Sequence, residues 1–245
     1  MSGAGRNRRR IRLTRARILM AAAAHGEGVA SRLSGQHAFS MTETIATLLD
    51  RSPAVRLTGP ELRRAIEHAV AELITALRDH HTGTADHSNR LAVDCRRVAE
   101  ELELGAGVVF EVELVAILHD IGKLAVPAAI LDLARPLDSR ERAVVRAHTI
   151  HGAEILAEIA GLRHLAPLVR ASHERWDGTG YPDGLAGEQI PPAARIVFAV
   201  DAFDAMTNDR PYRRALARAE ARRRIAAGAG TAFDPRVVRA MLAAL

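Results

Sequence analysis

The sequence predicts an all-α fold. Alanine is very frequent, and apolar residues recur every three or four positions rather than every two, which is the period of a helix and not of a strand. With 245 residues, 48% of them hydrophobic, the chain is long enough for one large domain with an extension. Its single cysteine, Cys95, cannot form an internal disulfide and fits a reducing cytoplasm. No stretch is long and apolar enough to predict a membrane-spanning helix.

The basic excess of the chain belongs to its first residues. The net charge is +5, yet residues 1–17 contain seven arginines and no acidic residue, so the rest of the chain is slightly acidic. Such a run can contact nucleic acid or anionic lipid, but we interpret it as a solvated, disordered tail. After this tail, several glycines and the Ser52-Pro53 pair interrupt longer helices, which predicts a small helical module over 18–82.

The first long helix is predicted over about 60–80. Thr58 followed by Glu61 has the spacing of a capping box, and Pro60 suits an early helical position. The apolar stripe of this helix consists of Leu62, Ile66, Ala69, Val70, Leu73 and Leu77. Thr82 and Gly83 follow the stripe, and the helix is expected to end before them.

Further helices are predicted over about 86–103, 109–120, 139–159, 163–174 and 193–207, with a loop rich in Gly and Pro over 177–192. Imidazoles and carboxylates lie in these helices or at their ends: His87, His119, Asp120, His148, His173 and Asp201. A buried carboxylate such as Asp120 costs several kcal/mol unless it is paired or binds a cation. Mixed nitrogen and oxygen ligands suit Mn, Fe or Zn, so the pattern indicates a metal site, although a His-Asp pair alone can also be a helix cap.

Several motifs follow one another in the last two thirds of the chain. They are His119-Asp120-Ile121-Gly122-Lys123, His148 four residues before Gly152, His173-Glu174 with Trp176-Asp177-Gly178-Thr179-Gly180-Tyr181-Pro182, Asp201 with Asp204, and Arg210-Pro211-Tyr212-Arg213. Together they resemble the HD-GYP family of bacterial phosphodiesterases, a branch of the HD-domain metal phosphohydrolases. The resemblance covers about residues 84–242, and it implies an HD-type helical bundle over 83–245.

The resemblance also implies roles for individual residues. One divalent metal would be held by His87, His119, Asp120 and Asp201, and a second by His148 and His173, with Asp120 bridging the two. Fe or Mn is implied, and a hydroxide between the metals would attack the phosphorus of cyclic di-GMP, giving the linear dinucleotide and, on further hydrolysis, GMP. Lys123, the only lysine in the chain, would lie beside the metals as a catalytic residue. Contacts with the cyclic dinucleotide are implied for Tyr181, Asp204, Arg210 and Arg213.

Two positions depart from the family pattern and keep alternatives open. Ser172 stands where members usually have a second histidine, and Gly83 stands where three-metal members carry a glutamate, so a weakened two-metal centre is expected. One alternative is a hydrolase of another nucleotide. The other is a degenerate, non-catalytic module that senses the dinucleotide or contacts a partner protein. Because a sensor commonly precedes the catalytic part in this family, residues 1–82 are interpreted as a regulatory or dimerising segment.

Overall fold

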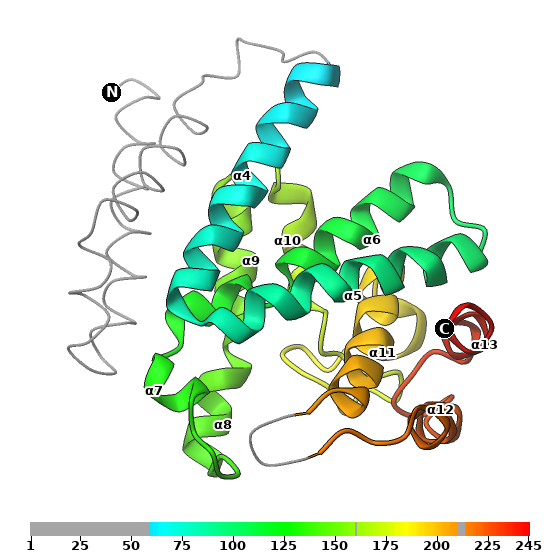
Figure 1. The fold of residues 1–245 in the computed structure, drawn as a ribbon. Coiled ribbons are helices and arrows are strands. Elements are labelled where there is room, and N and C mark those ends of the chain that lie inside the picture. The colour runs from blue at the N-terminus through cyan, green and yellow to red at the C-terminus, as the bar shows by residue number, and fades with distance from the viewer. Residues whose placement is uncertain (1–58, 160, 210–213) are drawn as a thin grey trace, which may run out of the picture.

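The computed structural model describes residues 59–159, 161–209 and 214–245 (Figure 1). Within these residues the fold is all-α, as predicted: it consists of α-helices and short 3₁₀ helices, with one isolated β-bridge between Ala229 and Phe233 and no β-strand. The predicted tail at 1–17 and the module up to residue 58 lie outside the described residues. The same is true of Arg210 and Arg213.

The first two described helices, α4 (Gly59–His80) and α5 (Thr82–Glu101), pack against each other. The bounds of α4 confirm the helix predicted over 60–80. Leu73 and Leu77 of α4 are buried in the same core as Leu91 and Cys95 of α5. The last part of the predicted N-terminal module therefore shares the core of the helices that follow it. The boundaries of tail, module and domain stay predictions.

Helix α6 (Ala106–Leu118) runs back along α5, and this pair makes the most extensive helix contact of the described residues (Figure 1). α6 is apolar nearly all round and buries Val112, Val115 and Leu118. A helix without a polar face is stable only inside a core. Consequently the residues that follow it, His119 and Asp120, are also buried.

The 3₁₀ helix η1 (Ile121–Ala125) passes very close to α9 (His148–Glu158). A Cβ atom added to Gly122 would lie 1.8 Å from the carbonyl oxygen of His148 and 2.4 Å from the amide nitrogen of Gly152. Only glycine allows two backbones to approach this closely. The contact places Asp120, two residues before Gly122, next to His148.

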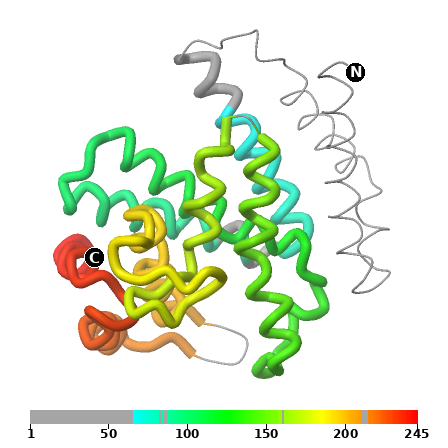
Figure 2. Tube along the Cα trace, turned by 180° about the vertical axis from the view of Figure 1, so that it is seen from behind, coloured from blue at the N-terminus to red at the C-terminus, as the bar shows by residue number. Residues whose placement is uncertain are grey.

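Two predicted helices are shorter than expected. The helix predicted over 139–159 is divided at Ala147 into α8 (Ser139–Arg146) and α9, because the Nδ1–H of His148 donates to the carbonyl oxygen of Val145. The helix predicted over 163–174 is a 3₁₀ turn, η2 (Arg163–Leu165), followed by α10 (Ala166–Arg170). His173 lies in the turn after α10, and from behind α9 and α10 are seen to lie side by side (Figure 2).

The C-terminal helices complete the bundle. The loop after His173 contains η3 (Gly187–Gln189) and leads into α11 (Pro192–Thr207), which matches the helix predicted over 193–207. α11 packs on α5 and α6 and carries Asp201 and Asp204. The last helices, α12 (Arg218–Ala227) and α13 (Pro235–Ala244), pack on α11, and the short α7 (Ala128–Leu131) lies before α8.

Candidate metal centre

Six side chains from different parts of the fold meet in two groups of potential metal ligands. Within each group, the ligand atoms lie within 4.8 Å of one another. The first group consists of His87 from α5, His119 from the end of α6 and Asp201 from α11, and the second of Asp120, His148 from α9 and His173 from the turn after α10. These are the same six residues that the sequence analysis expected to hold metals.

The carboxylate of Asp120 joins the two groups. Its Oδ2 lies 3.5 Å from Nε2 of His119, and its Oδ1 lies 3.4 Å from Nε2 of His148. The rings pair in the same way, with centroids 5.7 Å apart for His87 and His119 and 4.9 Å apart for His148 and His173. One carboxylate oxygen therefore faces each group, which is the arrangement needed for a bridging ligand.

The histidine tautomers favour metal binding. Nδ1 of His119 is 2.9 Å from the carbonyl oxygen of Ala116, and Nδ1 of His148 is 2.7 Å from that of Val145. A carbonyl only accepts hydrogen bonds, so both Nδ1 atoms carry a proton, and Nε2 is the atom of each ring that is left for a metal. The Nε2 atoms of His148 and His173 are buried without a hydrogen-bond partner among the described residues. Since buried nitrogen atoms are seldom left unpaired, these residues fit a bound cation.

The charges of the second group also suit a cation. Burial alone would raise the pKa of Asp120, but the neighbouring His119, Lys123 and His148 hold it well below its usual range. Burial lowers the pKa of His148 to about 3 and that of His173 to about 4. At neutral pH the carboxylate is therefore ionised and both imidazoles are neutral, which is the form in which each binds a metal.

Lys123 pairs directly with the bridging carboxylate. Its Nζ lies 2.6 Å from Oδ2 of Asp120, three residues earlier in the chain. The lysine side chain is 22% exposed, whereas that of Asp120 is 4% exposed. Lys123 therefore sits between the buried ligands and the solvent, beside the centre, as the resemblance implied.

His87 lies between two carboxylates. Its Nε2 is 3.0 Å from Oδ1 of Asp201, and its Nδ1 is 2.7 Å from Oδ2 of Asp204. Burial lowers the pKa of His87, but the hydrogen bonds to Asp201 and Asp204 outweigh it and raise the pKa to about 9. Asn208 donates to the other oxygen of Asp204. The structure thus places Asp204 behind a potential ligand, in the position of a carboxylate that orients an imidazole, whereas its expected contact with substrate stays a prediction.

The Gly-rich loop brings Tyr181 onto the centre. The Tyr181 ring stacks on that of His173, with centroids 5.2 Å apart and planes 6° from parallel. Glu174 holds the loop, because its Oε1 accepts hydrogen bonds from the amides of Asp183 at 2.7 Å and Gly184 at 3.0 Å. The sequence analysis did not find this role of Glu174, although the glutamate directly follows His173.

Ser172 directly precedes His173 in the chain, at the position where the family pattern has histidine, and its side chain is buried. Its Oγ has no hydrogen-bond partner among the described residues. The hydroxyl cannot supply the imidazole nitrogen that the family pattern offers, so the second group has one strong ligand fewer than that pattern.

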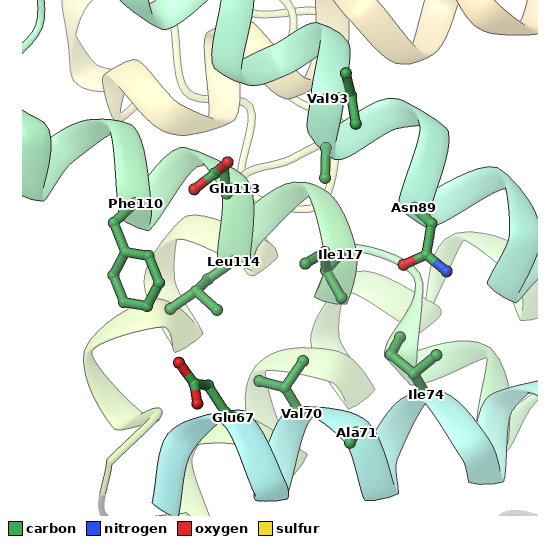
Figure 3. A pocket seen from close by; sticks show the side chains of 11 residues that line it. Glu67, Val70, Ala71, Ile74, Asn89, Val93, Phe110, Glu113, Leu114 and Ile117 are labelled. Carbon is green, nitrogen blue, oxygen red and sulfur yellow. The ribbon is translucent and has the colours of Figure 1, made fainter. Parts of the chain in front are cut away.

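An apolar pocket of about 380 Å³ lies between α4, α5 and α6 (Figure 3). Its walls are mainly aliphatic and aromatic side chains such as Val70, Ile74, Phe110 and Ile117, with Glu67 and Glu113 on either side. None of the six potential ligands lines it, so this pocket is separate from the candidate metal centre.

Among the described residues, no helix is both long and apolar enough to cross a membrane.

Comparison with known proteins identifies the family. A family model described as HD domain matches residues 71–237. A 3'3'-cGAMP-specific phosphodiesterase of Vibrio cholerae is 39% identical over 162 residues, which cover 66% of this chain and 35% of the relative. A cyclic di-GMP phosphodiesterase of Pseudomonas aeruginosa is 37% identical over 210 residues, which cover 85% of this chain and 47% of the relative. The chain therefore spans less than half the length of either relative.

A solved structure shares the fold. It is described as an HDG"Y"P protein from Bdellovibrio bacteriovorus, and it matches with a TM-score of 0.57 at 15% identity, covering 82% of this chain and 68% of its own. At this identity the likeness concerns the fold alone, and it agrees with the helical bundle predicted from the sequence. The match to the family model covers more than half of the chain and includes all six potential ligands. The chain therefore belongs to the HD domain family, and its motifs are those of the HD-GYP branch.

Proposed function

We propose that this protein is a metal-dependent phosphodiesterase that hydrolyses cyclic di-GMP to the linear dinucleotide, and further to GMP. The observation that carries the proposal is the pair of ligand groups joined by Asp120. Its relatives support the substrate class, because two of them are named as phosphodiesterases of cyclic di-GMP and of 3'3'-cGAMP.

The residues of the chain prepare the centre for two divalent cations, and the mixed nitrogen and oxygen ligands suit Fe or Mn. Bound there, such cations lower the pKa of water and neutralise charge on a phosphodiester. His119 and His148 would bind the cations through Nε2, because their Nδ1 atoms donate to backbone carbonyls. Asp120 stays ionised beside Lys123, whose ammonium adds positive charge where a phosphate would approach.

The net reaction defines what the site must accommodate. The oxygen of water forms a bond to phosphorus, the bond from phosphorus to the 3′ oxygen breaks, and the leaving oxygen takes up a proton. Lys123 pairs with the bridging carboxylate and is partly exposed to solvent, so it is the residue that contacts the phosphate in this proposal. Tyr181, stacked on His173, forms the wall against which a base or sugar of the substrate would pack.

A non-catalytic sensor is the alternative, and Ser172 is the residue that favours it. The six potential ligands nevertheless meet in two groups, and in the second group Asp120 is ionised while His148 and His173 are neutral, so we do not prefer the sensor. The two functions differ in turnover: a sensor binds the cyclic dinucleotide and releases no linear product.

The test is metal content and turnover of the purified full chain. We expect bound Fe or Mn and hydrolysis of cyclic di-GMP that Asp120→Asn abolishes together with the metal. His164→Gln is the matched control, because His164 is exposed and belongs to neither ligand group. Binding of cyclic di-GMP without turnover in the metal-loaded protein would refute the enzyme and favour the sensor. Faster turnover of another cyclic dinucleotide would correct the substrate.

The N-terminal segment is proposed to regulate or dimerise the domain, which we place in the cytoplasm. Because α4 contributes Leu73 and Leu77 to the core, the informative deletion removes residues 1–58 only. The expected result is a changed oligomeric state on gel filtration or a changed turnover number. If both stayed the same, the segment would have neither role.

A further inference from the structure

Arg146, the last residue of α8, stands over the ring that stacks on the candidate centre. Its Cζ lies 4.9 Å from the centroid of Tyr181, and the Tyr181 centroid lies 5.2 Å from that of His173. The guanidinium carbon is therefore no more than about 10 Å from the His173 ring. Two residues further along the chain is His148, another member of the same ligand group.

The guanidinium of Arg146 has no acidic partner among the described residues, and its side chain is exposed. Two arginines that pair with aspartates of the Gly-rich loop differ in this respect. Arg170 pairs with Asp183 at 2.6 Å, and Arg175 pairs with Asp177 at 2.7 Å. Contact with the Tyr181 ring orients a guanidinium without using its N–H donors, so those of Arg146 are available to a ligand.

The substrate class explains what such a cation could bind. A cyclic dinucleotide contains two phosphodiester groups, and each carries a negative charge. If one of them reacts at the metal centre, the other lies outside it and needs its own donor. A planar guanidinium that is fixed on an aromatic ring matches two phosphate oxygens at once.

We propose that Arg146 binds the second, non-reacting phosphate of the cyclic dinucleotide and so contributes to the choice of this substrate over diesters with one phosphate. The inference rests on the proposed phosphodiesterase function. It assigns to Arg146 a role in binding and none in bond cleavage.

The experiment compares two substrates and three variants of the full chain. The substrates are cyclic di-GMP, which has two phosphates, and bis(p-nitrophenyl) phosphate, which has one. Arg146→Ala removes the cation, Arg146→Lys keeps the charge but not the planar fork, and Arg140→Ala is the matched control. Arg140 is exposed on the same helix and contacts none of the residues of the centre by any hydrogen bond or ion pair of its side chain.

For Arg146→Ala we expect the KM for cyclic di-GMP to rise by about tenfold or more, which is the usual effect of losing a hydrogen bond to a charged group. The factor by which the KM for bis(p-nitrophenyl) phosphate rises should be about tenfold smaller than the factor for cyclic di-GMP. Arg146→Lys should lie between Arg146→Ala and the wild type, and metal content should follow the wild type in all three variants. An equal KM in wild type and Arg146→Ala would overturn the proposal. The proposal would also be overturned if Arg146→Ala raised the KM for both substrates by the same factor and lost its metal, because Arg146 would then act only by packing on Tyr181.

Calorimetric titration of cyclic di-GMP separates this inference from the proposed function. If the wild type turns over neither substrate, the phosphodiesterase proposal fails, but the contact is still tested by affinity. Weaker binding to Arg146→Ala than to wild type and Arg140→Ala would support the phosphate contact. Equal binding to all three would refute it.

Discussion

Adding one methyl group at Gly122 should damage the metal centre, because this glycine sets the distance between η1 and α9. The new Cβ would lie 1.8 Å from the His148 carbonyl oxygen and 2.4 Å from the Gly152 nitrogen. Both contacts are with backbone atoms, which cannot rotate away as the end of a side chain can. Ordinary van der Waals contact begins at 3.4 Å, so the two segments must separate by about 1.6 Å.

The size of the effect follows from that displacement. Overpacking a core by one methyl group typically costs about 1–3 kcal/mol, and a clash with backbone belongs at the upper end of that range. For a domain of this size, about 3 kcal/mol lowers the melting temperature by roughly 6–12 °C. A shift of this kind also moves His148 away from Asp120, whose oxygen is now 3.4 Å from the imidazole nitrogen. Affinity for metal should fall by about tenfold or more, as it does when ligands lose their support.

The assay is thermal unfolding of the metal-free protein together with metal titration, for Gly122→Ala and for Gly107→Ala. A Cβ at Gly107 meets nothing within 4 Å, and the residue lies in α6, where alanine is the better helix former. The control should keep its metal and melt at or slightly above the wild-type temperature. A Gly122→Ala variant with wild-type stability and metal affinity would show that the contact between η1 and α9 does not position the ligands.

Three further changes test the ligands themselves. Ser172→His should add an imidazole to the second group and raise the amount of metal that stays bound to the protein through gel filtration. An unchanged metal content would show that the side chain at this position does not face the site. Asp204→Asn should weaken metal binding by about tenfold through His87, whereas a higher KM with normal metal affinity would instead support the predicted substrate contact. Acidification from pH 6.5 to 5.5 should destabilise the metal-free protein by roughly 1.5 kcal/mol, as measured by denaturant titration. The folded-state pKa values of His148 and His173 are about 3 and 4, so in this pH range these two imidazoles take up protons only in the unfolded chain. His87 opposes this in part: its folded-state pKa is about 9, so its stabilising contribution is complete only below the unfolded value of 6.5 and still grows between pH 6.5 and 5.5. Stability that increases on acidification would refute the assignment.

Local signals predicted the helices better than the interruptions between them. The start of α4 follows from residues adjacent in sequence, and its predicted range agrees with the structure. The division between α8 and α9 depends on the bond from His148 to the carbonyl of Val145, which hydrophobic periodicity does not register. An apolar pattern that continues through residue 147 therefore looks like one helix.

The candidate site shows the same division between local and distant information. The resemblance named the six potential ligands, but their convergence depends on packing such as that of Gly122 against α9. The contact of Arg146 with Tyr181 could not be predicted from local sequence, because the two residues are 35 positions apart in the chain. The contact of Asp204 with His87, at 2.7 Å, could not be predicted because the two residues lie far apart in the chain, and the substrate contact that the resemblance implies for Asp204 stays a prediction.

The position of the single lysine in the chain has a physical explanation. Lys123 is the only lysine among 34 cationic residues, and its Nζ lies 2.6 Å from Oδ2 of Asp120. Oδ1 of the same carboxylate faces His148 at 3.4 Å. A guanidinium tends to engage both oxygens of a carboxylate, and it would then compete with any cation that Asp120 is meant to bridge. A compact ammonium makes a single contact, with Oδ2, and leaves Oδ1 and the second acceptor site of Oδ2 to the two ligand groups, so arginine and lysine are not equivalent at this position.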